Sequence, residues 1–187
     1  MKNPYIYGYL PLFSVILFSL TFGIYLVGES LGFLTGIGVY TGMREFLTDI
    51  ELRLLLLSVF VLCFFMLFSA LKLIGETIHE VGMLLFSKNN NGEMISVARG
   101  GYLIFFFGSL LSVFGVQSIY ILLCVFAVTI FSYFIFNIYK MSQFLSLSGT
   151  VGLIFFEILF WAIFITFICY VVLKLYNGLL ASLPFAK

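Results

Sequence analysis

The chain has 187 residues, of which 63% are hydrophobic and 9% are charged, and its formal net charge is +1. Soluble domains are about half apolar and about a quarter charged, so this composition excludes an ordinary soluble domain and predicts a membrane protein. A net charge this close to zero gives no electrostatic support to a nucleic-acid partner.

Two apolar stretches in the first half of the chain predict membrane-spanning helices. A helix needs about 20 apolar residues to cross the hydrocarbon core, and residues 10–27 and 53–74 meet that condition. The second stretch follows Thr48-Asp-Ile-Glu51, which has the pattern of a capping box at a helix start. Residues 75–86 are amphipathic, and we expect them to continue this helix along the membrane interface.

A glycine-rich segment lies between these two spans. Gly28, Gly32 and Gly36 recur every four residues, a spacing that is typical of close helix packing. The whole segment, 28–42, is about 15 residues long and therefore too short to cross a bilayer. We expect either a flexible loop or a re-entrant or interfacial segment.

The second half of the chain predicts three more spans. Residues 100–139 carry no Asp, Glu, Lys, Arg or His, and one helix of that length would be about 60 Å long, twice the hydrocarbon thickness. We therefore expect a tight hairpin at the polar break around Gln117, with spans near 101–116 and 119–139. Within the first of these, Gly108 and Ser112 belong to a stripe of small residues that predicts a helix-packing face. The last span lies near 150–173.

The predicted fold is all-α, a single polytopic bundle of about five transmembrane helices and one interfacial amphipathic helix. Its expected environment is the lipid bilayer. Cys63, Cys124 and Cys169 all lie in apolar runs, so we expect small hydrophobic side chains there and no disulfide framework. No motif indicates a cofactor.

Glu157 is the candidate functional residue. It lies in the apolar run 151–165, and no other charged residue occurs between Lys140 and Lys174. A carboxylate at such depth costs roughly 3 kcal/mol or more, so an intramembrane acid is a functional hypothesis by default. We expect no basic residue at its depth. Its candidate hydrogen-bond partners are Trp161, Gln117 and the Ser or Thr hydroxyls of other spans.

Two interpretations of this acid stay open. One is structural, with a neutral acid that is hydrogen-bonded inside the bundle or that meets a cation of a partner subunit. The other is a proton or cation relay in a transport path. A relay usually includes several polar groups, and the sequence offers one acid at this depth.

His79 is the single histidine of the chain, and Glu76 and Glu80 accompany it. The spacing Glu76-x-x-His79 occurs in carboxylate metal sites, which need further ligands from other helices. The run from His79 to Met83 lacks the second histidine of a zinc protease. We expect a solvated interfacial histidine that pairs with nearby acids, the alternatives being a weak metal site or a pH-sensitive contact. No established metal-site pattern is present.

These observations favour a protein that is not an enzyme. No P-loop sequence occurs, and none of the predicted spans contains a histidine that could serve a nucleophile. We expect an accessory or interaction protein that associates with another membrane protein or with itself. The alternative is a small transporter or an ion or proton pathway that uses Glu157. An enzyme centred on Glu76, His79 and Glu80 ranks third.

Four stretches of the sequence carry a family resemblance: Met1-Lys-Asn3 leading to Tyr9-Leu-Pro-Leu12, Phe68-Ser-Ala-Leu-Lys-Leu73, Val151-Gly-Leu-Ile-Phe155, and Lys174-Leu-Tyr-Asn-Gly-Leu-Leu-Ala-Ser-Leu-Pro184. On these stretches the chain resembles the YufK family of small Bacillus membrane proteins over nearly its full length. The resemblance implies a multi-pass protein of a bacterial plasma membrane. It implies no activity and transfers no functional residue.

Overall fold

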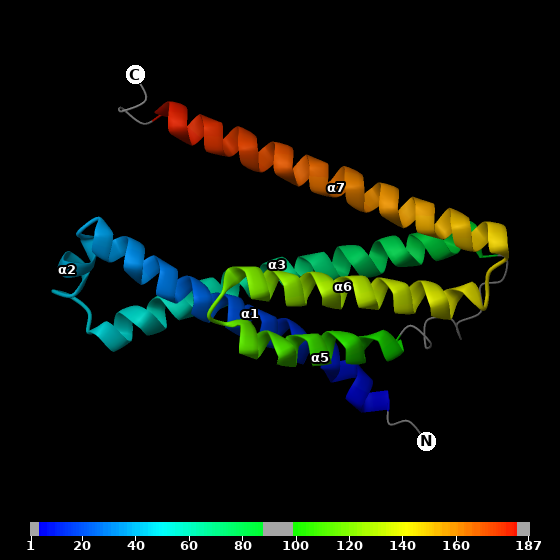
Figure 1. Ribbon diagram of the computed structural model, residues 1–187, viewed down its shortest axis with the longest axis horizontal. Helices are drawn as coiled ribbons and strands as arrows, with labels where there is room; N and C mark the ends of the chain where they lie inside the picture. Colours follow the sequence, from blue (N-terminus) through cyan, green and yellow to red (C-terminus); the bar gives the residue numbers. More distant parts are fainter. Residues whose placement is uncertain (1–3, 88–98, 183–187) are drawn as a thin grey trace. The chain divides into compact units, whose positions relative to one another are not determined.

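Every regular element in the described part of the chain is a helix. The computed structural model describes residues 4–87 and 99–182, and Figure 1 shows their helices in chain order. With η marking a 3₁₀ helix, the elements are α1 (Pro4–Gly36), α2 (Val39–Met43), α3 (Asp49–Phe86), η1 (Arg99–Gly101), α5 (Tyr102–Ser112), η2 (Val113–Gly115), α6 (Ile119–Ser142) and α7 (Leu147–Ser182). The all-α prediction is confirmed.

Four of the described helices are long and apolar enough to cross a bilayer. Their apolar segments are Gly8–Gly36, Asp49–Phe86, Ile119–Ser142 and Leu147–Gly178. The remaining predicted span, 101–116, forms a shorter apolar helix over Tyr102–Gly115. The 11 residues of α5 cover about 17 Å, roughly half the hydrocarbon thickness. The chain is a multi-pass membrane protein.

The helices α1 and α3 extend well beyond the predicted spans. α1 has 33 residues and ends at Gly36, so most of the glycine-rich segment is helical. The chain turns at Gly38, whose φ of 76° lies in the left-handed region that favours glycine, and α2 begins after it. α3 has 38 residues and continues through residues 75–86 without a break.

The chain divides into two compact units. The first comprises Met1–Gly75 and Asn91–Gln143, and the second comprises Glu76–Asn90 and Phe144–Lys187. The boundary falls within α3, so the first unit holds α1, α2, most of α3, α5 and α6. The second unit holds the last turns of α3 together with α7.

A cluster of phenylalanines forms the centre of the first unit. Phe18 and Phe22 of α1 pack with Phe68 of α3 and Phe126 of α6. The ring centroids of Phe68 and Phe126 are 4.9 Å apart, and those of Phe18 and Phe126 are 5.2 Å apart. Aromatic contacts at these distances add to the dispersion energy that holds helices together in lipid, where the hydrophobic effect between helices is weak.

Small residues bring α5 close to its neighbours. A Cβ added at Gly108 would collide with the side chain of Thr129 on α6, with Thr129 Cβ only 2.8 Å away. The hydroxyls of Thr21 on α1 and Ser112 on α5 share a buried hydrogen bond of 3.1 Å. Gly108 and Ser112 therefore lie at a close helix contact, where the sequence placed them.

The other predicted packing glycines make no close contact within the described residues. A Cβ added at Gly28, Gly32 or Gly36 would meet no atom of these residues within 4 Å. For the part of the chain that the structure describes, the prediction that these three glycines form a packing face is wrong. Four-residue spacing makes a smooth helix surface, but a close contact also requires a second helix on that surface.

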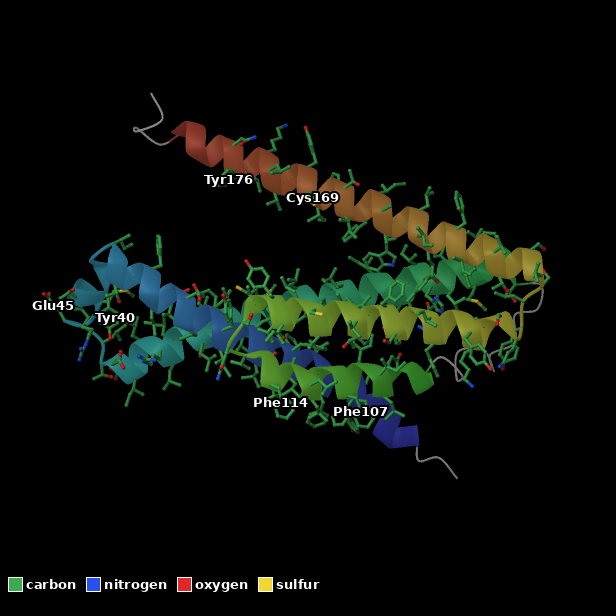
Figure 2. All side chains as sticks on the ribbon, in the orientation of Figure 1. Tyr40, Glu45, Phe107, Phe114, Cys169 and Tyr176 are labelled. Atoms are coloured by element: carbon green, nitrogen blue, oxygen red, sulfur yellow. The ribbon has the colours of Figure 1, made fainter. Side chains whose placement is uncertain are left out.

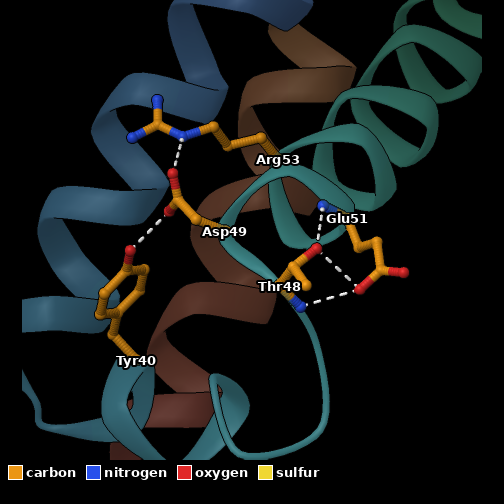
Figure 3. Close-up of polar contacts among 5 residues, drawn as sticks. All are labelled: Tyr40, Thr48, Asp49, Glu51 and Arg53. Carbon is orange, nitrogen blue, oxygen red and sulfur yellow. Dashed lines mark hydrogen bonds and ion pairs between the residues drawn. The ribbon is translucent and has the colours of Figure 1, made fainter.

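Polar side chains fix the start of α3 (Figure 3). The backbone N–H of Thr48 donates to Glu51 Oε2 at 2.8 Å, and the N–H of Glu51 donates to Thr48 Oγ1 at 3.3 Å. This reciprocal pair confirms the predicted capping box. Beside it, Asp49 accepts hydrogen bonds from the Tyr40 hydroxyl at 2.5 Å and from Arg53 Nε at 3.0 Å.

Apolar side chains also cover the outer surfaces of the helices, as lipid contact requires. Phe107 and Phe114 are 60% and 86% exposed, and Cys169 and Tyr176 lie on the exposed surface of α7 (Figure 2). Cys63 and Cys124 are exposed and free as well. All three cysteines lie at exposed positions on apolar helices.

Candidate functional site

In the second unit, α7 packs on the last turns of α3 through glycines. A Cβ added at Gly82 would lie 2.5 Å from Leu153 Cδ1, and a Cβ at Gly152 would lie 2.5 Å from Phe86 Cε1. The rings of Phe86 and Phe156 have centroids 6.3 Å apart. Residues earlier in this part of α3 pack against residues later in α7, so the two segments run antiparallel. The glycines allow this close approach because they carry no side chain.

This contact buries Glu157. Glu157 lies ten residues after the start of α7, about 15 Å along the helix. It is 5% exposed, and Leu153, one turn earlier on the same face, is fully buried. The candidate acid therefore faces α3 and not lipid.

The partner of Glu157 is His79. The Nδ1 atom of His79 and the Oε1 atom of Glu157 are 2.5 Å apart, and their side chains are 14% and 6% exposed. Two predictions are wrong at this point. Glu157 does have a basic residue at its depth, and His79 is not a solvated interfacial side chain. The helix α3 continues through residue 86, which carries His79 into the contact with α7.

A proton must lie between these two atoms, because the lone pairs of an unprotonated nitrogen and oxygen would repel each other. Either the Nδ1–H of His79 donates to the carboxylate, or the carboxylic acid donates to Nδ1. A pair that holds two protons in total has zero net charge, and a pair that holds one proton carries a charge of −1.

The second ring nitrogen of His79 has no partner among the described residues. Nε2 is buried and makes no hydrogen bond within the described residues. Buried polar atoms are normally paired, and exceptions often mark a place where a water, an ion or a proton acts. Nδ1 of His79 therefore contacts Glu157, whereas Nε2 can still bond to a water or exchange a proton.

The predicted partners of Glu157 have other surroundings. Trp161 packs edge-to-face on Phe160 and Phe164 of its own helix, with centroids 5.8 and 5.7 Å away, and no hydrogen bond to Glu157 is described. Gln117 lies in the first unit, between η2 and α6. The hydroxyls of Ser14, Ser19, Ser58, Ser109, Ser112 and Thr129 bond to carbonyls of their own helices.

The two other acids of the predicted metal or pH site are less involved. Glu80 is exposed, and Glu76 lies one turn before His79 on α3 and has an interaction of its own. Across residues 4–87 and 99–182, no group of three His, Cys, Asp or Glu side chains could hold a metal ion.

Comparisons with known proteins agree with this description of a membrane protein. The family described as "Family of unknown function (DUF5366)" matches residues 27–184. The chain is 38% identical over 184 residues to the uncharacterized membrane protein YufK of Bacillus subtilis (strain 168), covering 98% of this chain and 100% of that protein. No solved structure matches. The resemblance inferred from the sequence is confirmed.

Proposed function

Because the chain belongs to the family of unknown function DUF5366, we propose its function from its own geometry. It is a non-enzymatic protein of the bacterial cell membrane that provides a pathway for cations. Glu157 and His79 form the ion-binding site of this pathway. The ion pathway, which ranked second from the sequence, ranks first here. The reason is that the fold places His79 in contact with Glu157.

One observation carries the proposal: an acid and a base share a buried contact between two long apolar helices. Placing ionisable groups in such surroundings costs free energy, so they are rare in spans and usually serve ion or proton movement. A purely structural contact between α3 and α7 would need neither group, because Gly82, Gly152 and Leu153 already pack tightly.

The surroundings of His79 support the non-enzymatic part of the proposal. A hydrolase triad needs a nucleophile on the second ring nitrogen, and Nε2 has no hydroxyl or thiol partner in the described ranges. The run Gly28-Glu29-Ser30-Leu31-Gly32 does have the Gly-x-Ser-x-Gly spacing of a hydrolase nucleophile. It lies inside α1, whereas such a nucleophile needs a sharp turn between a strand and a helix.

Reconstitution into liposomes tests the proposal. We expect wild-type protein to carry monovalent cations across the bilayer in response to a membrane potential, and we expect Glu157→Gln to lower that current at least about tenfold. The matched control is Glu80→Gln, which removes an exposed acid one position beyond His79. Equal currents in wild-type and Glu157→Gln liposomes would refute the pathway.

The second candidate function is the accessory or interaction protein expected first from the sequence. It is favoured by the half of α7 that follows Glu157, where Ile163, Phe167 and Tyr170 are about 60% exposed. Cys169 lies on this half and is free and exposed. In a variant with Cys63 and Cys124 replaced by Ala, oxidation in native membranes would join two copies through Cys169 if α7 associates with itself. A monomer after oxidation would count against self-association through this surface.

A further inference from the structure

We propose that the transported ion is the proton and that His79 is its second carrier, taking the proton at one ring nitrogen and releasing it at the other. This inference rests on the proposed cation pathway because it names the ion for the same site. It uses the contact at Nδ1 and the unpaired Nε2 of His79.

The ligand set separates the proton from metal cations. Hard cations such as Na⁺ or Mg²⁺ take several oxygen ligands. The site offers one carboxylate and one imidazole, and no three-ligand cluster of His, Cys, Asp and Glu occurs among the described residues. Both α3 and α7 are unbroken helices here, so their backbone carbonyls are used in helical hydrogen bonds. A proton needs only the two atoms that are in contact.

The transfer balances in three steps. Glu157 starts as a carboxylic acid, with His79 neutral and protonated at Nε2. The acid proton moves to Nδ1, which leaves a carboxylate and an imidazolium. The imidazolium then gives its Nε2 proton to a water molecule, and the neutral ring keeps the proton at Nδ1 for the Glu157 carboxylate. The Glu157 carboxylate takes a proton from water on the entry side, so one proton has entered at Glu157 and one has left at Nε2. When the ring then turns away from Glu157, Nδ1 gives its proton to water and Nε2 takes one from the same water, which restores the starting tautomer without further net transfer.

In the second unit, the other charged residues on the two helices are Glu76, Glu80 and Lys174. On α3, Glu76 lies one turn before His79 and Glu80 is exposed beside it. On α7, the other charged residue is Lys174, which lies 17 positions after Glu157, about 26 Å along the helix. His79 is seven positions from the end of α3 at Phe86, about 10 Å. Measured along the helices, the end of α3 therefore lies nearer to the pair than Lys174 does.

The experiment measures proton and sodium fluxes separately in liposomes that contain the full chain. An internal pH dye reports protons and an internal sodium dye reports Na⁺, with wild type, Glu157→Gln, His79→Gln and Glu80→Gln compared. Gln at position 79 can still hydrogen-bond to Glu157 but cannot accept a proton. The variant therefore distinguishes proton transfer by His79 from its structural role in the helix contact. Circular dichroism and size-exclusion chromatography establish that each variant is folded. The comparison of proton flux with sodium flux in the wild-type protein does not depend on whether any variant folds.

We expect proton flux in wild type and Glu80→Gln, a decrease of at least about tenfold in both Glu157→Gln and His79→Gln, and no sodium flux. Sodium flux that depends on Glu157, without proton flux, would overturn the proton assignment and leave the cation pathway standing. Proton flux lost in Glu157→Gln but retained in His79→Gln would overturn the role of His79 alone. No flux of either ion in wild type would overturn the pathway itself.

Discussion

The Nδ1 atom of His79 and the Oε1 atom of Glu157 lie 2.5 Å apart, although 78 positions separate the two residues in the chain. This contact joins the end of α3 to α7 in the second unit and gives the lone acid of α7 a titratable partner. An isolated acid in a span is a hypothesis without a mechanism. An acid in contact with an imidazole is a defined site for a proton.

Replacing Glu157 by Leu is expected to destabilise the protein, because Nδ1 of His79 would lose the partner that it has among the described residues. The expected loss is about 1–3 kcal/mol of unfolding free energy, the cost of leaving a buried polar group unpaired. Glu157→Gln is the matched control, since its side-chain amide can still bond to the imidazole. Denaturant unfolding in detergent measures both. A Leu variant that is as stable as the Gln variant would contradict the buried contact.

Gly108 permits the close approach of α5 and α6, so Gly108→Ala is expected to destabilise the first unit. The added methyl group would meet Thr129, whose branched side chain has few alternative rotamers, and such overpacking costs about 1–3 kcal/mol. Gly32→Ala is the control, because a Cβ there meets no described atom within 4 Å and Ala favours a helix over Gly by about 0.5–1 kcal/mol. Thermal unfolding should shift in opposite directions in the two variants. A Gly108→Ala variant that is at least as stable as wild type would refute the Gly108 contact.

The hydrogen bond between Thr21 and Ser112 should contribute modestly to stability. Thr21→Val removes it and keeps the shape of the side chain, so we expect a loss of about 0.6 kcal/mol, the average for hydrogen bonds between membrane helices. Thr166→Val serves as the control, because Thr166 is exposed and bonds only to the carbonyl of Ala162 in its own helix. Denaturant unfolding should show a larger loss of unfolding free energy in Thr21→Val than in Thr166→Val.

Tyr40 should titrate above its ordinary pKa of 10.0. The hydrogen bond that its hydroxyl donates to Asp49 raises the pKa of Tyr40, because the bond exists only while the phenol is protonated. Its stabilising effect is therefore present below the unfolded-state pKa and is lost as pH rises through the higher folded-state pKa. Carbon-13 NMR of ring-labelled tyrosine follows this residue, with Tyr40→Phe identifying its signal. In Asp49→Asn the midpoint should fall, and an unchanged midpoint would contradict the assignment.

The sequence predicted the parts of the fold that depend on local chemistry. Apolar length predicted the spans, the Thr48 and Glu51 pattern predicted the cap of α3, and small residues predicted the contact at Gly108 and Ser112. Each of these depends on residues close together in the chain or on composition alone. The same reasoning failed at Gly28, Gly32 and Gly36, because a close contact also depends on where another helix lies.

The sequence did not predict the contact of His79 with Glu157, because the amphipathic pattern of residues 75–86 predicts a helix along the membrane interface. The apolar positions Val81 and Leu85 are exposed, and the contact with α7 uses His79, Gly82 and Phe86. In a membrane the apolar face turns to lipid, and polar and small residues face the protein. The spacing of His79, Gly82, Met83 and Phe86 was the available signal, and Gly149, Gly152, Leu153 and Phe156 form its counterpart on α7.

The most direct measurement is nitrogen-15 NMR of histidine-labelled protein in lipid bilayers. Because the chain contains one histidine, the label reports His79 alone. The account predicts an Nδ1 signal typical of a nitrogen that shares a proton with a carboxyl group, and this signal should move clearly in Glu157→Gln but not in Glu80→Gln. An imidazole spectrum that is the same in wild type and in Glu157→Gln would contradict the contact on which the proposed pathway depends.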